Sequence, residues 1–285
     1  MDAHFKPEHY HRPVDMKTAS ALLAQRGARV IAGGTDLLVN GPASTESLVD
    51  INGLGLSYIR EDDGLRIGST TSFSYLLRSP LLERYPYRVI ADAAGELGHH
   101  NLRHVATVGG NICNAVPSAD APVALIALDA AVIIHGPSGE RTVPLDGFFK
   151  FVRETILGEG EFLKEIAVPV QPESGACFQK LGRTKVDIAL VNAACRLSII
   201  DGLISDSRIV LGAVYPTPLR VRAAEDMLNG KEFTVELVAK TAIIASDATK
   251  PISDHRASAE YRREISSVLV KRAIIKAYGR AEGPP

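Results

Sequence analysis

Two pairs of adjacent glycines constrain this chain more than any other feature of its sequence. Gly33-Gly34 follows the apolar run 30–32, and Gly109-Gly110 follows the run 106–108. Because glycine has no Cβ, each pair allows backbone conformations closed to other residues and lets the main chain approach a ligand closely. Hydroxyl, amide and acid side chains follow both pairs, and such turns can direct several backbone N–H groups at one anion. The pattern therefore predicts two glycine turns that hold one phosphate-bearing ligand.

The overall composition excludes several classes of partner. Of the 285 residues, 46% are hydrophobic and 23% are charged, as in ordinary globular proteins. The formal net charge is -1, from 32 basic and 33 acidic residues, so no global charge attracts nucleic acid or an anionic membrane. Tryptophan is absent and aromatic residues make up only 6%, which disfavours a stacking platform for single-stranded nucleic acid.

The chain also lacks sequence signals for a membrane or for a bound metal. No apolar run approaches the roughly 20 residues of a membrane-spanning helix, and residues 1–7 lack the apolar region of a secretory signal. We therefore expect a cytoplasmic protein. The cysteines Cys113, Cys177 and Cys195 are too few and too far apart for a disulfide framework or a paired zinc site. They also cannot supply four thiolates to an iron–sulfur cluster, so any cluster would lie on another chain.

Hydrophobic periodicity and turn signals predict an α+β fold in two domains. The expected helices span 13–27, 72–77, 89–97, 120–128, 223–228 and 257–278, and the expected strands span 29–32, 65–68, 131–135, 141–144, 165–168, 189–200 and 204–214. Asp15 and Asp120 are expected to cap their helices. The stretch 171–175 resembles a linker most, which divides the chain into 1–173 and 174–285.

The familiar nucleotide-binding motifs are absent. The chain contains neither a strand-linked G-x-G-x-x-G nor a G-x-x-x-x-G-K-[ST] sequence, which argues against Rossmann and P-loop folds. Plain turn chemistry is the alternative interpretation of each Gly-Gly pair taken singly. The residues alone therefore lead only to a candidate anion site.

Five segments resemble a known family. Residues 32–38 (Ala-Gly-Gly-Thr-Asp-Leu-Leu) and 107–112 (Thr-Val-Gly-Gly-Asn-Ile) resemble the paired flavin-binding motifs in the FAD-bearing medium subunit of molybdenum hydroxylases. This family includes the flavin parts of xanthine dehydrogenase and carbon monoxide dehydrogenase. The resemblance continues in 178–183, 187–189 and 254–263, and it covers essentially the whole chain.

The resemblance implies a fold and a set of cofactor contacts. The fold is a two-lobed FAD-binding domain of the vanillyl-alcohol-oxidase (PCMH) type, followed by a small α+β domain like the C-terminal domain of carbon monoxide dehydrogenase flavoprotein. In this family's pattern the FAD contacts are Ala32, Gly33, Gly34, Thr35, Asp36, Leu37, Leu97, Thr107, Gly109, Gly110, Asn111, Asp120, Leu163, Lys180 and Ile188.

These positions have different implied roles. Residues 32–37 would wrap the FAD pyrophosphate, and Thr107, Gly109, Gly110 and Asn111 would complete the cradle. Asp120 would lie near the ribose or adenine, and Leu97 and Leu163 would be apolar contacts. Lys180 would be a polar contact, with Gln179 as the alternative, and Ile188 would lie over the flavin ring, where it would control access of the electron acceptor. No residue of this chain is assigned a catalytic role.

The resemblance also implies partners and a function. The chain would be the electron-transfer flavoprotein subunit of an oxidoreductase, within a dimer of heterotrimers. A large subunit would carry the molybdenum cofactor, and a small subunit would carry two [2Fe-2S] clusters. Electrons would reach FAD from these clusters and pass to NAD, oxygen or a quinone. The chain has no cysteine-rich insertion, which disfavours the form of the subunit found in 4-hydroxybenzoyl-CoA reductase.

Two other functions remain as alternatives. A standalone FAD reductase or oxidase, similar to the UDP-N-acetylenolpyruvylglucosamine reductases, would turn over without partner chains. The segment 256–263 speaks against it. An assembly subunit that binds no flavin is the second alternative, and the two intact glycine pairs argue against it.

Several other residues are better explained without a function. We interpret His99, His100 and His104, and likewise His4, His9 and His11, as surface histidines. Cys113 is expected to be a small buried apolar residue. Arg183 and Asp187 are expected to form an ion pair, and the basic residues 262–263 and 271–272 to line the solvent face of a helix.

Overall fold

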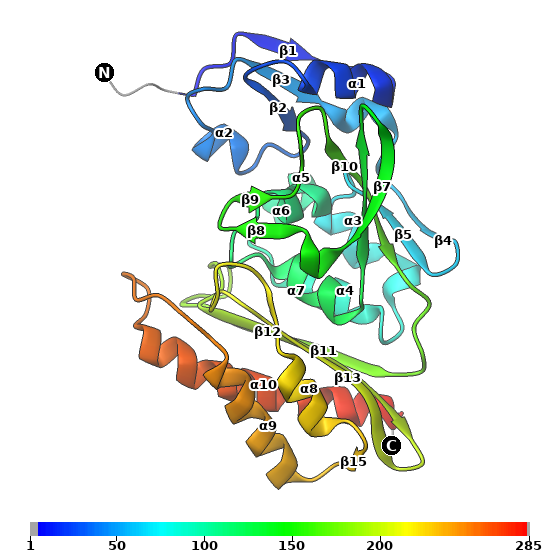
Figure 1. Cartoon of the computed structure of the whole chain (residues 1–285), viewed down its shortest axis with the longest axis vertical. Helices are drawn as coiled ribbons and strands as arrows, with labels where there is room; N and C mark the ends of the chain where they lie inside the picture. Colours follow the sequence, from blue (N-terminus) through cyan, green and yellow to red (C-terminus); the bar gives the residue numbers. More distant parts are fainter. Residues whose placement is uncertain (1–4, 284–285) are drawn as a thin grey trace.

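Three hydrophobic cores divide the computed structural model, which describes residues 5–283. Figure 1 shows the corresponding parts stacked along the long axis of the molecule, from a small blue lobe through a larger middle lobe to a C-terminal layer. The mixture of parallel and antiparallel sheets with helices on their faces confirms the predicted α+β class.

The first lobe is a three-stranded parallel sheet with one covering helix. Its elements are β1 (His9–His11), α1 (Met16–Leu23), β2 (Ala28–Ile31), α2 (Leu37–Asn40), β3 (Ser47–Asp50) and the 3-10 helix η1 (Ile51–Leu54). Strand β3 lies between β1 and β2 and runs parallel to both. Asp15 caps α1 as predicted, by accepting from the Thr18 amide at 2.8 Å, but the helix ends at Leu23 rather than at Gly27.

The middle lobe packs helices against an antiparallel sheet ordered β4-β5-β10-β6-β7. Its strands are β4 (Ile59–Glu61), β5 (Leu65–Gly68), β6 (Ala131–Gly136), β7 (Gly139–Pro144), β8 (Phe149–Phe151), β9 (Glu154–Thr155) and β10 (Phe162–Val168). Its helices are α3 (Phe73–Arg78), η2 (Pro80–Leu82), α4 (Arg88–Gly95), α5 (His100–Val105), α6 (Val108–Cys113), α7 (Asp120–Ala127) and η3 (Leu145–Gly147). The predicted hairpin, β6 with β7, is confirmed.

The C-terminal layer is an antiparallel sheet buried on both faces. Its elements are β11 (Gly175–Leu181), β12 (Val191–Ile200), β13 (Leu203–Gly212), β14 (Leu219–Arg220), α8 (Arg222–Leu228), β15 (Lys231–Glu232), α9 (Val235–Asp247) and α10 (Ala259–Ala281). Alternate side chains point to opposite faces of a strand. Phe178 and Ala194 accordingly join the middle core, whereas Cys177 and Cys195 join the core under α10. Helices α4 and α7 therefore cover one face, and α10 covers the other (Figure 1).

The structure corrects two sequence predictions near the glycine pairs. Gly109 and Gly110 do not form a turn, because they lie inside α6, where the Thr107 hydroxyl caps the helix by accepting from the Gly110 amide at 3.1 Å. Asp120 does not cap α7. Ala119 occupies the N-cap, and Asp120 is the first helical residue, with its carboxylate turned toward Lys180 and Asn192.

Other differences lie in the C-terminal layer. Strand β11 and helix α9 have no counterpart among the predicted elements, and α10 begins at Ala259 rather than at Ala257. The prediction that residues 262–263 both line a solvent face is wrong for Arg262, which is buried and paired with Asp254 at 2.9 Å. The predicted Arg183–Asp187 pair is confirmed, at 2.7 Å. Within residues 5–283, no helix has the length and apolarity needed to cross a membrane.

Candidate cofactor-binding site

The two glycine segments lie against each other, backbone to backbone. A Cβ on Gly33 would stand 2.2 Å from the carbonyl oxygen of Val105, at the end of α5. The chain continues from there through Ala106 into the second pair. Only a residue without a side chain can occupy such a contact. The fold therefore joins β2 and the α5–α6 connection into one site, although they are far apart in the sequence.

The first segment offers unpaired backbone donors. Gly34 adopts a positive φ of +66°, which turns the chain sharply after β2. The amides of Gly33, Gly34, Thr35 and Asp36 donate no hydrogen bond to any residue in 5–283. Successive unpaired amides in such a turn form a concave site for an anion. This geometry fits a pyrophosphate group.

The second segment contributes close packing. The Gly109 amide donates to the Ser69 carbonyl at 2.9 Å, and the Gly110 amide donates to the Thr107 hydroxyl. These two amides are therefore already paired within the chain. A Cβ on Gly109 would lie 2.6 Å from the Ser69 carbonyl oxygen, so α6 packs closely against the backbone that follows β5. Gly110 is exposed, so the start of α6 is open to solvent on that side.

Arg153, which no sequence motif marks, connects the first segment to the end of α6. It lies in the turn between β8 and β9, with a φ of +60°. Its guanidinium donates to Asp36 at 3.3 Å and to Asn114 at 3.2 Å, and its amide donates to the Ala115 carbonyl at 2.8 Å. Figure 1 shows this green hairpin below α2. A charged residue at the tip of a hairpin is too common in protein sequences to indicate a binding site.

Asp120 and Lys180 form a buried ion pair across the two domains. The Lys180 ammonium donates to Asp120 at 2.7 Å and to the Glu96 carbonyl at 2.9 Å, and both charged side chains are about 5% exposed. Asn192 donates to the other carboxylate oxygen at 2.7 Å. Burial raises the pKa of Asp120, whereas Lys180 and Asn192 oppose that shift. In this structure both oxygens of Asp120 are engaged within the chain.

Leu97, Leu163, Asn111 and Ile188 lie in different surroundings. Leu163 is buried in β10, and Leu97 is half-buried beside the same middle core. The Asn111 side-chain oxygen accepts from the Ala121 amide at 3.3 Å, which joins α6 to the start of α7. Ile188 is 44% exposed on the loop between β11 and β12. No hydrogen bond or ion pair within the described residues links Ile188 to another predicted contact.

Cys113 is not positioned as a reactive thiol. It packs against the middle core, and burial raises its pKa to about 12, partly opposed by a backbone hydrogen bond from Leu163. A thiol with so high a pKa carries almost no thiolate near neutral pH. This supports the interpretation of Cys113 as a small apolar residue.

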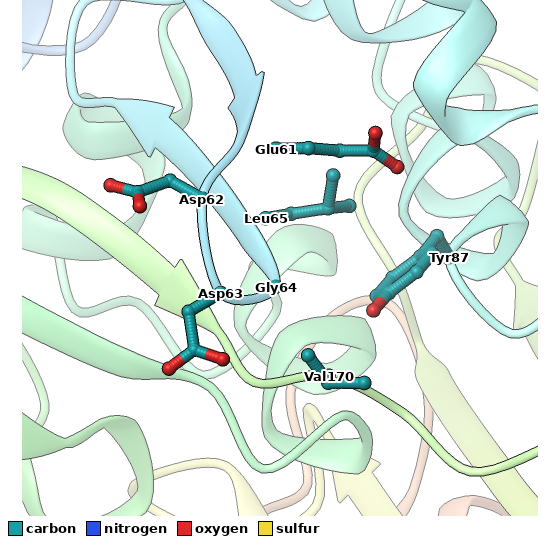
Figure 2. A pocket seen from close by; sticks show the side chains of 7 residues that line it. All are labelled: Glu61, Asp62, Asp63, Gly64, Leu65, Tyr87 and Val170. Carbon is teal, nitrogen blue, oxygen red and sulfur yellow. The ribbon is translucent and has the colours of Figure 1, made fainter.

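Two surface cavities differ in their relation to this site. The first, shown in Figure 2, is lined by Glu61, Asp62, Asp63, Gly64, Leu65, Tyr87 and Val170. None of these is a predicted contact, and Asp62 and Asp63 point away from Tyr87 in that view. The second has a volume of about 370 Å³ and lies between α4, β11 and α10, with Lys180 on its wall. Of these two cavities, only the second is lined by a predicted FAD contact, Lys180.

Comparisons with known proteins decide the family. Residues 3–171 match the FAD binding domain in molybdopterin dehydrogenase, and residues 176–277 match the CO dehydrogenase flavoprotein C-terminal domain. The chain belongs to the FAD-binding subunits of the molybdopterin dehydrogenases.

The relatives of this flavoprotein subunit span its whole length. The carbon monoxide dehydrogenase medium chain of Hydrogenophaga pseudoflava is 36% identical over 280 residues, with 95% of this chain and 97% of the relative covered. The xanthine dehydrogenase FAD-binding subunit of Escherichia coli O157:H7 is 32% identical over 285 residues, with 96% and 97% covered.

Solved structures of the family share the fold. Carbon monoxide dehydrogenase from Hydrogenophaga pseudoflava superposes with a TM-score of 0.92 at 36% identity, and the alignment covers 97% of this chain and 99% of that one. Quinoline 2-oxidoreductase from Pseudomonas putida 86 gives 0.90 at 29% identity, with 98% and 99% covered. The predicted family, fold class and FAD cofactor are thereby confirmed, and the chain is a flavoprotein subunit of an oxidoreductase.

Proposed function

We propose that this flavoprotein subunit relays electrons from [2Fe-2S] clusters on a partner chain to an external acceptor such as NAD, oxygen or a quinone. The observation that carries the proposal is the row of unpaired amides from Gly33 to Asp36, held against the α5–α6 connection. Membership of the FAD-binding family supports FAD as the ligand of this row. FAD supplies the redox chemistry when bound.

The residues of the chain then bind and orient the cofactor. In the proposal, the amides of 33–36 bind the pyrophosphate, and the start of α6 closes the cradle from the other side. Thr107 and Asn111 would fix that start, and the Asp120–Lys180 pair would lie toward the nucleoside. Leu97 and Leu163 would wall the apolar part, and Ile188 would lie over the flavin ring. None of these groups needs to act as an acid, base or nucleophile.

The proposed partners follow from the relatives, which are medium chains or FAD-binding subunits of larger enzymes. We place the chain in a dimer of heterotrimers with a small [2Fe-2S] subunit and a large molybdenum-cofactor subunit. Substrate specificity would lie on the large subunit. The three free cysteines fit a reducing compartment, and we propose the cytoplasm. We also propose that the two domains meet between residues 173 and 174.

Two measurements on the purified chain and its complex test this proposal. The chain reconstituted with FAD should show flavin absorbance and bind stoichiometrically. The complex isolated from its native source should contain iron and molybdenum and should reduce its flavin when substrate is added. Reduction of FAD by NADH followed by turnover in the isolated chain, without partner subunits, would instead support a standalone reductase. A complex that is active without flavin would overturn the proposal.

A further inference from the structure

Two histidines on α5 lie close enough to chelate one metal ion. His100 and His104 occupy positions i and i+4, so their side chains leave the same face of the helix. Their Nε2 atoms are 2.9 Å apart, and the ring centroids are 4.5 Å apart. Both residues are exposed, so an ion from solvent can reach both Nε2 atoms, which lie within hydrogen-bond distance of each other. Two histidines at this spacing on one helix face are a known zinc-binding arrangement.

The neighbouring His99 and Arg103 are engaged in contacts with the backbone around α5. The Nδ1 atom of His99 accepts from the Leu102 amide at 3.3 Å, so His99 serves as the N-cap of α5. The guanidinium of Arg103 donates to the carbonyls of Gly95, Leu97 and Gly98, which fixes the loop before the helix. The residues in 5–283 contain no group of three potential ligands. Water would therefore complete the coordination of a metal here.

The separation of the nitrogens selects a class of metal. Imidazole nitrogens bind Zn²⁺ at about 2.0–2.1 Å. At that distance, the 2.9 Å separation corresponds to an N–metal–N angle of about 90°. This angle is narrower than a tetrahedral one and suits two adjacent positions of a square-planar or octahedral ion. Cu²⁺ and Ni²⁺ prefer such tetragonal geometry with nitrogen and oxygen ligands.

We propose that His100 and His104 form a two-histidine site for Cu²⁺ or Ni²⁺ on α5. This helix leads into the cofactor clamp, by which we mean residues 33–36 packed against the α5–α6 connection. The bound ion would cross-link one turn of α5. Because the carbonyl of Val105 at the end of α5 lies against Gly33, the cross-link would stiffen a wall of the clamp. The site is independent of the proposed electron relay, since its ligands are not FAD contacts.

The test is a titration of the tag-free full-length chain with CuCl₂ and with NiCl₂. Calorimetry measures binding of each ion, and electron paramagnetic resonance identifies the ligands of Cu²⁺. Wild type should bind one Cu²⁺ at this site with a spectrum of two nitrogen ligands. His100→Ala and His104→Ala should each weaken that site by at least about tenfold, because loss of a supporting contact alone costs that much in known sites. Ni²⁺ should also slow amide hydrogen exchange across residues 102–105.

The matched controls are His255→Ala and the double variant His9→Ala/His11→Ala. His255 is an exposed single histidine. His9 is exposed and His11 is half-buried, and they form a second histidine pair, on β1, with ring centroids 6.2 Å apart. Both controls should keep the site with two nitrogen ligands. The proposal is overturned if His104→Ala binds Cu²⁺ with wild-type affinity and an unchanged spectrum. It is also overturned if the site disappears in the His9/His11 variant. Circular dichroism confirms that each variant is folded.

Discussion

Arg153 is the side chain that ties the two glycine segments together, and its removal should weaken FAD binding. Its ion pair with Asp36 is about half exposed, so it contributes at most about 1 kcal/mol. We expect Arg153→Ala to raise the dissociation constant for FAD by about threefold to fivefold, measured by flavin fluorescence titration. The physical reason is that the guanidinium no longer links Asp36 of the first segment to Asn114, so the segment must be ordered by the cofactor itself.

A matched variant separates this effect from general loss of surface charge. Arg141 makes a similarly exposed pair with Glu161 in the same lobe, but it contacts neither glycine segment. Arg141→Ala should leave the FAD affinity unchanged. Equal affinities for Arg153→Ala and wild type would show that the hairpin does not support the clamp.

Asp254 is a second residue whose substitution should change the stability of the protein measurably. Burial alone would raise its pKa, but the amides of Arg256 and Ala257 and the guanidinium of Arg262 hold it well below its usual range. A carboxylate whose pKa is lower in the folded state stabilises the protein above its unfolded pKa of about 3.9, and this stability is lost as the pH falls through the folded pKa. Asp254→Asn should therefore reduce the free energy of unfolding by about 2–3 kcal/mol at neutral pH, because buried Arg262 loses its partner.

The pH dependence distinguishes this charge effect from a packing effect. In denaturant titrations, the difference between Asp254→Asn and wild type should narrow as the pH falls from about 5 toward 3. Glu236→Gln is the control, because its pair with Lys240 is largely solvent-exposed and should contribute little. A difference that stays constant across this range would contradict the proposed charge pairing.

At the scale of elements, the clamp depends on two close backbone contacts. A Cβ at Gly33 would lie 2.2 Å from the Val105 carbonyl oxygen, and one at Gly109 would lie 2.6 Å from that of Ser69. Neither neighbour is a flexible side chain, so β2 or α6 must shift. We expect Gly33→Ala and Gly109→Ala to lower FAD affinity by at least about tenfold, since closely fitted sites lose function on displacements of about 1 Å.

The control for backbone substitution is Gly147→Ala in η3. The nearest atom to a Cβ there is 4.0 Å away, so the substitution meets no clash. It should bind FAD as wild type does, with the same thermal unfolding midpoint. Wild-type affinity in Gly33→Ala would mean that the two segments do not pack as the structure describes.

Elements with strong local signals were predictable from the sequence. The Asp63-Gly64 turn sets the start of β5 at Leu65, and the Asp201-Gly202 turn, with both residues at positive φ, joins β12 to β13. Helix α6 was not predictable, because two adjacent glycines disfavour a helix. The Thr107 cap and the contact with Ser69 override that preference.

The relation between distant residues was less predictable. Family resemblance pointed to both glycine segments, but only the fold shows Gly33 against Val105. The Arg153–Asp36 pair joins residues 117 positions apart and leaves no periodic trace in the sequence. Arg262 was misjudged for a related reason. A basic residue on a long helix usually faces solvent, and the carboxylate that pairs with Arg262 comes from the loop before α10, where Asp254 is partly buried.

At the scale of the whole molecule, Asp129 joins the FAD-binding lobes to the C-terminal layer. It follows α7, and its carboxylate faces three arginines of the C-terminal sheet, Arg196 at 3.4 Å, Arg208 at 2.8 Å and Arg220 at 3.0 Å. The Arg196 side chain is only 2% exposed, and it also donates to the Ala127 carbonyl at 3.2 Å. This network fixes the orientation of the C-terminal layer, which carries Lys180 and Ile188, against the lobes that hold the clamp.

Asp129→Asn should therefore loosen the two domains without altering the clamp. The substitution removes one carboxylate from three mostly buried arginines. Each arginine keeps a second carboxylate, Asp206 for Arg196 and Arg208 and Glu225 for Arg220, so we expect a loss of about 1–2 kcal/mol in the free energy of unfolding. Asp146→Asn is the matched control, because its pair with Arg222 also crosses the domains at 3.0 Å but Arg222 is 66% exposed, so its loss should cost about 0.5 kcal/mol or less. Because burial is the main difference between the two pairs, equal losses in both variants would show that the Asp129 network does not hold the domains together.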